Sequence, residues 1–175
     1  MTLSRLLLAL FFVAGAAAAQ PVSRTPAPDN DFDTKPWEEQ KSRLPSNPNP
    51  ENLARIYAGP TTSFEFYVDT ASVSVSQDGV VRYTLVARSS SGATNVSYEG
   101  MRCKTYDRKL YALGRFDGAW SPARDPQWVP IGRAQAKFQY AALAEDFFCP
   151  QRIPVPTAEE AMRALKRGNQ PGPVR

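Results

Sequence analysis

The sequence contains no histidine at all. This absence excludes histidine-based catalytic triads and dyads, and it excludes every zinc or haem site that needs an imidazole ligand. A serine nucleophile elbow, a phosphate-binding glycine loop and a dinucleotide fingerprint are missing as well. Most hydrolase mechanisms are therefore excluded, and we expect no cofactor.

Cysteine is scarce, with only Cys103 and Cys149 in the chain. Two cysteines are too few for a zinc or iron–sulfur centre. Because an oxidising compartment lets such a pair close, we expect one disulfide between them. A redox-active pair is the alternative, but such pairs usually have the spacing Cys-x-x-Cys. Closing a loop of about 46 residues would stabilise the fold by roughly 4 kcal/mol in the chain-entropy estimate.

Long hydrophobic runs are absent after the first nineteen residues. That segment has a cationic start, formed by the α-amine and Arg5, continues with apolar residues and ends in alanines at 17–19. The pattern predicts a cleavable secretory signal at 1–19, with the mature protein starting at Gln20. A membrane anchor is the alternative, but the run is shorter than the roughly 20 apolar residues that cross a bilayer. Because no cysteine near residue 20 could accept a lipid, we expect a soluble exported protein without a transmembrane segment.

A strong excess of charge of one sign is also missing. After removal of the leader, the chain has 20 basic and 17 acidic side chains, which gives a net charge of +3. Mild basicity favours contact with anionic surfaces such as cell-wall polymers, whereas nucleic-acid binders concentrate their charge in a patch or stripe. We expect no nucleic-acid partner, and an envelope protein or a cell-wall polymer is the expected partner class.

Proline marks the first quarter of the predicted mature chain. Eight prolines lie between residues 20 and 60: Pro21, Pro26, Pro28, Pro36, Pro45, Pro48, Pro50 and Pro60. This composition buries little apolar surface and predicts a tether or wrapping arm at 20–60. Within it, Trp37 is expected to dock onto the domain, because an isolated tryptophan usually finds a pocket. One domain at 61–168 and a flexible tail at 169–175 complete the division.

From Phe64 to about Ile131 apolar and polar residues alternate, which is typical of half-buried strands. The alternation is clearest at 64–69 and 81–88. Turns are expected at Asp78-Gly79, at Ser89 to Gly92 and at Asp117-Gly118. Further strands are expected around Val96 and Tyr98, at 109–115 and near Trp120. Connections this short leave no room for crossovers, so the pattern predicts an antiparallel meander of four to six strands.

Two helices are expected after the strands. The first covers Phe138 to Phe147, and the second follows Thr157, which forms a capping box with Glu160 and precedes good helix formers up to Gly168. The predicted fold class is therefore α+β, with one or two C-terminal helices packed on an antiparallel sheet.

Acidic residues are the remaining candidates for metal binding and catalysis. Asp29, Asp31 and Asp33 alternate like calcium-loop ligands, but Thr34 and Gln40 stand where the loop needs glycine and glutamate, so we expect no metal. A glycosidase needs two carboxyl groups about 5 to 10 Å apart. Seven acids are candidates by residue type: Glu65, Asp69, Glu99, Asp107, Asp117, Glu145 and Asp146.

Aromatic and arginine residues alternate in the stretch that contains the last predicted turn. Arg115, Trp120, Arg124 and Trp128, followed by Arg133, combine the side chains that interfaces favour. We predict a binding surface at the first four, able to stack on sugars or to hold carboxylates. The alternative is that both tryptophans fill the core and the arginines are ordinary surface charges.

Five motifs in the chain resemble those of one exported bacterial family. They are Phe66-Tyr67-Val68-Asp69, Asp78-Gly79-Val80-Val81-Arg82-Tyr83-Thr84, Asn95-Val96-Ser97-Tyr98-Glu99-Gly100-Met101-Arg102-Cys103, Lys109-Leu110-Tyr111-Ala112 and Phe148-Cys149-Pro150. The family is labelled CNP-one-like and is of unknown function. The resemblance covers about Trp37 to Gly168 and implies a one-domain periplasmic protein of Gram-negative bacteria, with both cysteines inside its motifs.

Taken together, these observations predict an exported, non-enzymatic binding or scaffolding module associated with the envelope. The alternative is a small hydrolase that acts on a cell-wall sugar through two carboxylates.

Overall fold

The computed structural model describes residues 36–60, 62–132 and 138–169. From Trp37 onward the chain forms one compact unit. The predicted leader at 1–19, the aspartates at 29–33 and residues 170–175 of the predicted tail lie outside the described residues. Among the described residues, no cluster of three or more acidic or cysteine side chains could hold a metal ion. No helix in these ranges is long and apolar enough to span a membrane.

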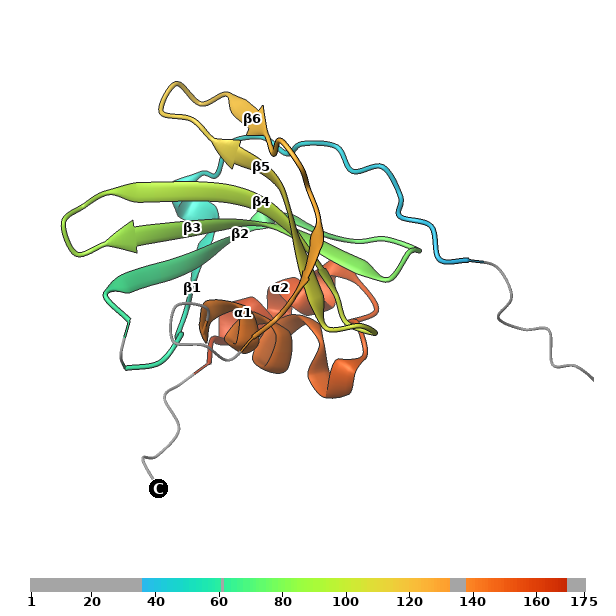
Figure 1. The fold of residues 1–175 in the computed structure, drawn as a ribbon. Coiled ribbons are helices and arrows are strands. Elements are labelled where there is room, and N and C mark those ends of the chain that lie inside the picture. The colour runs from blue at the N-terminus through green and yellow to red at the C-terminus, as the bar shows by residue number, and fades with distance from the viewer. Residues whose placement is uncertain (1–35, 61, 133–137, 170–175) are drawn as a thin grey trace, which may run out of the picture. The chain divides into compact units, whose positions relative to one another are not determined.

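The centre of the unit is a seven-stranded antiparallel sheet (Figure 1). Its strands are β1 (Leu53–Ile56), β2 (Phe64–Val75), β3 (Val80–Ser89), β4 (Thr94–Arg102), β5 (Asp107–Gly114), β6 (Trp120–Pro122) and β7 (Trp128–Pro130). The first six lie side by side in chain order, so the predicted antiparallel meander is confirmed. The last two share one edge, because β6 pairs with the end of β5 and β7 pairs with its beginning.

The turn signals in the sequence lie where strands reverse direction. Gly79 between β2 and β3 has φ +73°, and Gly118 between β5 and β6 has φ +83°. Both angles belong to the left-handed region, which glycine enters without a steric penalty. The two Asp-Gly turns are therefore local features that the sequence specifies by itself.

Strand β2 contains an irregularity that the alternation pattern did not predict. Asp69 pairs with Thr84, yet Ser74 already pairs with Arg82, so extra residues bulge out of β2. The Ser72 hydroxyl fills the gap: it donates to the carbonyl of Asp69 at 2.7 Å and accepts from the backbone N–H of Thr84 at 2.7 Å. A bulge of this kind bends the strand.

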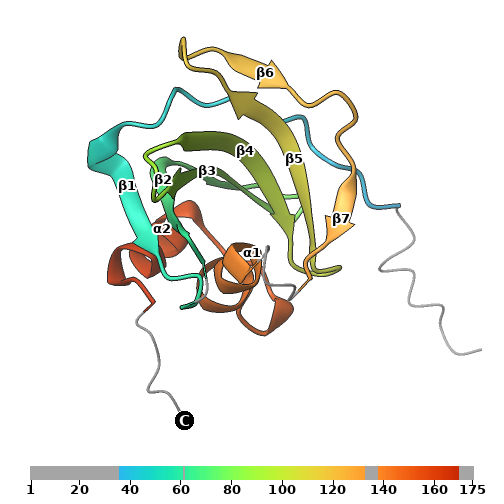
Figure 2. The same ribbon diagram turned by 60° about the vertical axis from the view of Figure 1, so that its left-hand side comes forward.

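Helices cover one face of the sheet (Figure 2). They are α1 (Phe138–Ala142), the π-helical turn η3 (Leu143–Phe148), the 3₁₀ turn η4 (Pro150–Arg152) and α2 (Ala158–Arg167), and a further 3₁₀ turn, η1 (Pro50–Asn52), precedes β1. The cap of α2 lies where the sequence predicts it, since the Thr157 hydroxyl accepts from the backbone N–H of Glu160 at 3.2 Å. Gly168 ends this helix with φ +69°.

The hydrophobic core lies between the helices and the sheet. Its centre is Tyr83 on β3, whose ring packs on Phe148 with 4.9 Å between centroids. The other fully buried members come from strands and helices alike: Val68, Val81, Met101, Leu143, Ala144 and Ala161. Burying these side chains on both layers is the main stabilising term of the fold.

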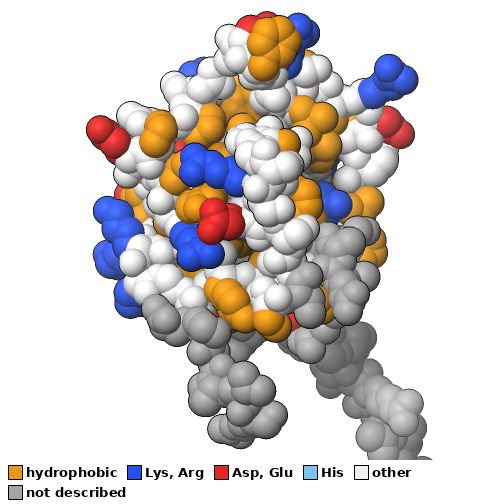
Figure 3. All heavy atoms as spheres, turned by 90° about the vertical axis from the view of Figure 1, so that its left-hand side faces the viewer, with side chains coloured by type: hydrophobic (Ala, Val, Ile, Leu, Met, Phe, Trp, Pro, Cys, Tyr) orange, Lys and Arg blue, Asp and Glu red, His pale blue; other side chains and the backbone are white. Residues whose placement is uncertain are grey.

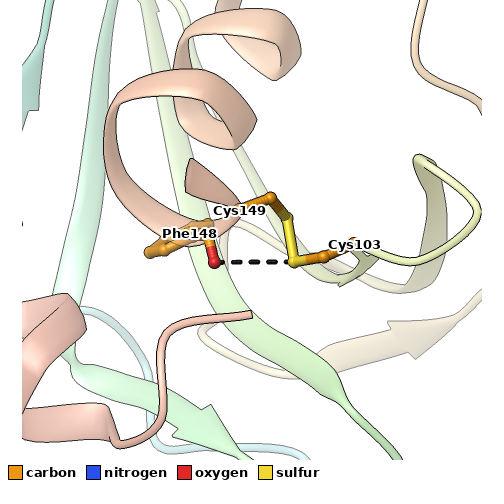
Figure 4. The surroundings of a disulfide bond; sticks show 3 residues. All are labelled: Cys103, Phe148 and Cys149. Carbon is orange, nitrogen blue, oxygen red and sulfur yellow. Dashed lines mark hydrogen bonds between the residues drawn. A yellow bond between two sulfur atoms is a disulfide. The ribbon is translucent and has the colours of Figure 1, made fainter. Parts of the chain in front are cut away.

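One disulfide joins the two layers (Figure 4). Cys103, just after β4, bonds to Cys149, just after η3, with 5.2 Å between Cα atoms. The sulfur of Cys103 lies 3.5 Å from the carbonyl oxygen of Phe148, and the two cysteines are 0% and 2% exposed. The disulfide predicted from the sequence is confirmed, and it lies inside the core.

Replacing both cysteines by serine should destabilise the protein by about 4 kcal/mol, because the bond closes a loop of 46 residues. Urea unfolding followed by far-UV circular dichroism measures the change. Serine adds buried hydroxyls, so a Cys-to-Ala pair serves as the matched control. A midpoint equal to that of the native protein in both pairs would contradict the role of the bond.

Candidate functional site

The segment at residues 37–49, called the arm segment below, runs along the sheet face opposite the helices (Figure 1). Its anchors are hydrogen bonds to distant parts of the chain. The indole N–H of Trp37 donates to the carbonyl of Asp78 at 2.8 Å, and the indole N–H of Trp120 donates to the carbonyl of Pro45 at 2.8 Å. The docking of Trp37 agrees with the sequence expectation. The compact unit thus starts near Trp37 and includes much of the stretch assigned to the arm.

A buried ion pair lies under the arm segment. Arg82 on β3 is 2% exposed and donates to Asp78 Oδ2 at 2.7 Å and to the carbonyl of Gln40 at 2.9 Å. The backbone N–H of Gln40 donates to the same carboxylate at 2.9 Å. Burial alone would raise the pKa of Asp78, but the bonds from Arg82, Gln40 and Val80 outweigh it and hold that pKa below its ordinary value.

Three donors converge on a single carboxylate of the arm segment. Lys109 Nζ lies 2.8 Å and Trp128 Nε1 3.1 Å from Glu39 Oε2, and the hydroxyl of Tyr111 donates to Oε1 at 2.7 Å. We call Lys109, Tyr111 and Trp128 the carboxylate socket. Burial would raise the pKa of Glu39, but these bonds and the charge of Lys109 outweigh it, so its pKa lies below the ordinary value. The socket therefore favours the ionised form.

Neighbouring residues hold the socket in place. The ring of Tyr111 lies over Gly100 on β4, where an added Cβ would come within 2.6 Å of the Tyr111 hydroxyl oxygen. Trp37 meets the ring of Trp128 edge to face at 5.9 Å, and the guanidinium of Arg102 stacks 3.8 Å from the centre of the Trp37 ring. Edge-to-face and cation–π contacts of this kind fix aromatic side chains in one orientation.

The four predicted binding residues lie on one edge of the sheet. Trp120 on β6 and Trp128 on β7 are half-buried, and the arm segment accepts the hydrogen bonds of both indoles. Arg115 is exposed at the β5–β6 turn, 3.5 Å from Asp117, and Arg124 is exposed between β6 and β7. Neither tryptophan lies in the helix-side core. A binding role for these four residues stays a prediction.

The seven candidate acids are dispersed over the fold. Glu65 and Asp69 lie on β2, Glu99 on β4, Asp107 on β5, Asp117 in the β5–β6 turn, and Glu145 and Asp146 on η3. Two of them are buried, Asp69 and Glu99, and Glu99 accepts from the Ser97 hydroxyl at 2.6 Å and from the Tyr140 hydroxyl at 3.2 Å. Its burial raises its pKa despite these bonds. It is 2% exposed and faces the helix layer, so no substrate reaches it in this conformation.

An open groove of about 670 Å³ lies at the end of the sheet where the β1–β2 loop passes the end of β3. We call it the end groove. Its walls are Arg55–Pro60 and Thr62–Glu65, together with Ser89 and Ser90. This end of the molecule presents hydrophobic, basic and acidic side chains side by side (Figure 3).

The end groove combines exposed aromatic rings with polar groups. Tyr57 is 37% and Phe64 38% exposed. Arg55 Nη2 lies 3.0 Å from Glu65 Oε1, and the Tyr67 hydroxyl donates to Glu65 Oε2 at 3.0 Å. Asn169 holds the wall by two hydrogen bonds to the backbone of Tyr57, at 2.7 and 2.8 Å.

Sequence reasoning missed this groove because its residues come from two segments that are well separated in the chain. Residues 55–60 were assigned to the proline-rich arm, and β1 was not predicted. The short alternation Leu53-Ala54-Arg55-Ile56 was the available signal for β1.

The comparison with family models supplies an identity. The model of the CNP1-like family matches residues 32–166. The chain belongs to the CNP1-like family. This confirms the resemblance drawn from the sequence motifs, and the match includes the arm segment, the socket and both cysteines.

A search of curated proteins matches this CNP1-like chain to "Cryptic neisserial protein 1" of Neisseria gonorrhoeae. The two are 25% identical over 118 residues, which cover 61% of this chain and 58% of the relative. The chain thus spans little more than half the length of the curated relative that it matches. No solved structure gives a significant match.

Acidification should release the arm segment before the sheet unfolds. Glu39 on the arm segment and Asp78 beneath it, which accepts from the Gln40 backbone N–H, have lowered pKa values. Their contribution to docking is present above the ordinary carboxyl pKa of about 4 and is lost as the pH falls through the lowered values. All three tryptophans of the chain lie at this interface, so their emission should shift to the red at a higher pH than circular dichroism changes.

The Glu39→Gln variant is the control for this titration. Glutamine does not ionise, so the variant should show a shallower change that belongs to Asp78. Emission and circular dichroism that change at the same pH in the native protein would contradict separate release of the arm segment.

Proposed function

We propose that this CNP1-like protein is an exported, non-enzymatic binding module of the bacterial envelope, and that its end groove holds a cell-wall saccharide. The observation that carries the proposal is the open hollow in which two exposed aromatic rings, Tyr57 and Phe64, flank an ion pair and several hydroxyl groups. Its volume falls in the range of roughly 300 to 1,000 Å³ that small-molecule sites occupy.

The chemistry of the groove favours a sugar over a strongly charged ligand. Aromatic faces carry negative potential and attract the C–H groups on one side of a sugar ring. The hydroxyls of Ser89, Ser90 and Thr62 and the Arg55–Glu65 pair offer donors and acceptors to the sugar hydroxyls. Because the lining carries one basic and one acidic side chain, it provides no excess charge for a polyanion.

The number and surroundings of the acidic residues at the end groove argue for a binding role and against hydrolysis. Glu65 is the one acidic side chain among the described lining residues, and Arg55 and Tyr67 both contact its carboxylate. Glycosidase chemistry needs a second carboxyl group across the cleft. The nearest candidate along β2, Asp69, is buried in the bulge, where its Oδ1 accepts from the backbone N–H of Ala71.

Export is supported by the leader-like first nineteen residues and by the buried disulfide, which oxidising compartments maintain. In a Gram-negative host, the periplasmic fraction should contain the protein with Gln20 as its first residue. Mass spectrometry of the intact protein measures the N-terminus. Protein that retains residues 1–19 and resides in the cytosolic fraction would refute export.

Binding to the groove is tested with soluble cell-wall glycan strands from which the peptides have been removed. Tyr57→Ala and Phe64→Ala should each weaken binding by about 10-fold, because each removes an aromatic contact of about 1.4 kcal/mol. Isothermal titration calorimetry measures the affinity.

The matched control is Phe116→Ala, which removes an aromatic ring that is 99% exposed and lies outside the groove lining. This variant should bind as the native protein does. Absence of glycan binding, or equal losses in the control and the groove variants, would contradict the proposal. Binding to intact peptidoglycan but not to peptide-free strands would indicate a peptide ligand and would overturn the saccharide assignment.

A further inference from the structure

We propose that the sheet face beneath the arm segment is a second binding site, which takes an extended segment of a partner protein that carries a glutamate two residues after an aromatic ring. The arm segment, with Trp37 and Glu39, is the ligand that occupies this site within the chain. The inference concerns a different surface from the end groove and does not depend on the saccharide proposal.

The first argument is the geometry of the arm segment, which is that of a bound peptide. Its hydrogen bonds to the rest of the unit join residues 38 to 89 positions apart in the chain. Contacts over such separations do not depend on the covalent connection between the two partners. A segment of another protein with the same side chains could make each of them.

The second argument is the chemistry of the face. The carboxylate socket offers Lys109 Nζ, the Tyr111 hydroxyl and Trp128 Nε1 to one carboxylate, and Trp120 Nε1 is directed at a backbone carbonyl. These four groups serve as donors, and beside them the carbonyl and the carboxylate of Asp78 accept from the Trp37 indole and the Gln40 backbone N–H. Among the described residues, the carboxylate that pairs with Lys109 is Glu39 of the arm segment, and this positive charge favours an acidic ligand.

The third argument is that the face is preorganised. Tyr111 rests on Gly100 and packs against Tyr98 at 5.6 Å, while Arg82 is paired with Asp78 of the same hairpin. These contacts belong to the sheet and do not involve the arm segment. Sites that are held by their own scaffold bind with less loss of conformational freedom.

The fourth argument is that the main core does not include the arm segment. The helix-side core is assembled from residues at 54 and beyond, including Ile56, Tyr83 and Phe148. The link between the arm segment and β1 is the short stretch Pro50–Asn52, and the end of the arm segment before it contains Pro45 and Pro48. The arm segment can therefore leave the face without extracting core side chains.

Tethering sets the condition under which a partner binds. A tethered ligand has an effective concentration on the order of millimolar, so a competing segment must bind more tightly or be presented close by. The arm segment then excludes weak, non-specific acidic peptides and admits a partner of higher affinity. Competition between the arm segment and the partner segment for the same face thus provides specificity.

The test starts from the full, folded protein. A protease site inserted between Pro48 and Asn49 allows the chain to be cut after folding near the end of the arm segment, which separates residues up to Pro48 from the body. The body should remain folded by circular dichroism, and a synthetic peptide of residues 36–48 should rebind with a measurable affinity, followed by tryptophan emission.

Two substitutions test the socket itself. A peptide with Glu39→Gln should bind at least ~10-fold more weakly, since it loses bonds to a charged acceptor. Tyr111→Phe in the body should weaken the native peptide by about 5-fold while it keeps the ring, because it removes one donor. A peptide in which every residue except Trp37, Glu39 and Pro45 is alanine should compete with the native peptide. Such competition would show that these three positions suffice for recognition, so that a segment of another protein could bind.

Three outcomes would overturn the inference. The cut protein unfolds when the peptide leaves, the Glu39→Gln peptide binds as tightly as the native one, or the alanine-rich peptide fails to compete. Each would mean that the arm segment is a structural part of this fold and not a replaceable ligand. None of these results bears on glycan binding at the end groove.

Discussion

Strand β3 is buried on both of its faces, and this constraint organises the rest of the molecule. Every residue from Val80 to Val86 is buried. Val81, Tyr83 and Leu85 face the helices, while Arg82 faces the arm segment. An antiparallel sheet usually leaves one face to solvent. Here the second face contains Arg82, whose donors need acceptors: Asp78 of the same hairpin supplies a carboxylate, and the arm segment covers the guanidinium with the carbonyl of Gln40.

This arrangement divides the surface into a covered and an open part. The carboxylate socket and both sheet-edge tryptophans lie under the arm segment, whereas Tyr57 and Phe64 remain accessible at the end groove. Sequence analysis predicted an aromatic and arginine binding surface at 115–128. In the structure, aromatic and arginine side chains lie both under the arm segment and at the end groove. The half-buried state of Trp128 follows from a segment almost ninety positions away in the chain.

The elements that the sequence predicted are those with a local signal. Period-two alternation locates β2 to β5, Asp-Gly pairs locate two of the turns, and Thr157 with Gly168 delimits α2. Because the chain has only two cysteines, one disulfide pairing was possible, and the structure contains it. These features depend on neighbours in the chain or on elimination, so a single sequence suffices.

The features that sequence reasoning missed depend on long-range contacts. Nothing near Glu39 indicates that its partners are Lys109 and Tyr111, because the three meet only after the sheet has formed. Strand β7 is three residues long and begins at Trp128, too short for a periodic pattern. The bulge in β2 likewise replaces ladder bonds with the Ser72 hydroxyl, which no alternation rule predicts.

The buried polar groups explain why covalent closure matters in this fold. Glu99 Oε2 has no hydrogen-bond donor among the described residues, and the guanidinium of Arg108 stays 3.8 Å away. A buried polar atom without a partner costs about 1 to 3 kcal/mol. Glu99 lies on β4, and the disulfide begins at Cys103, immediately after the same strand. The hydroxyls of Tyr83 and Thr84 also lack a partner among the described residues, so the roughly 4 kcal/mol expected from the bond offsets part of the cost of an interior that is not fully paired.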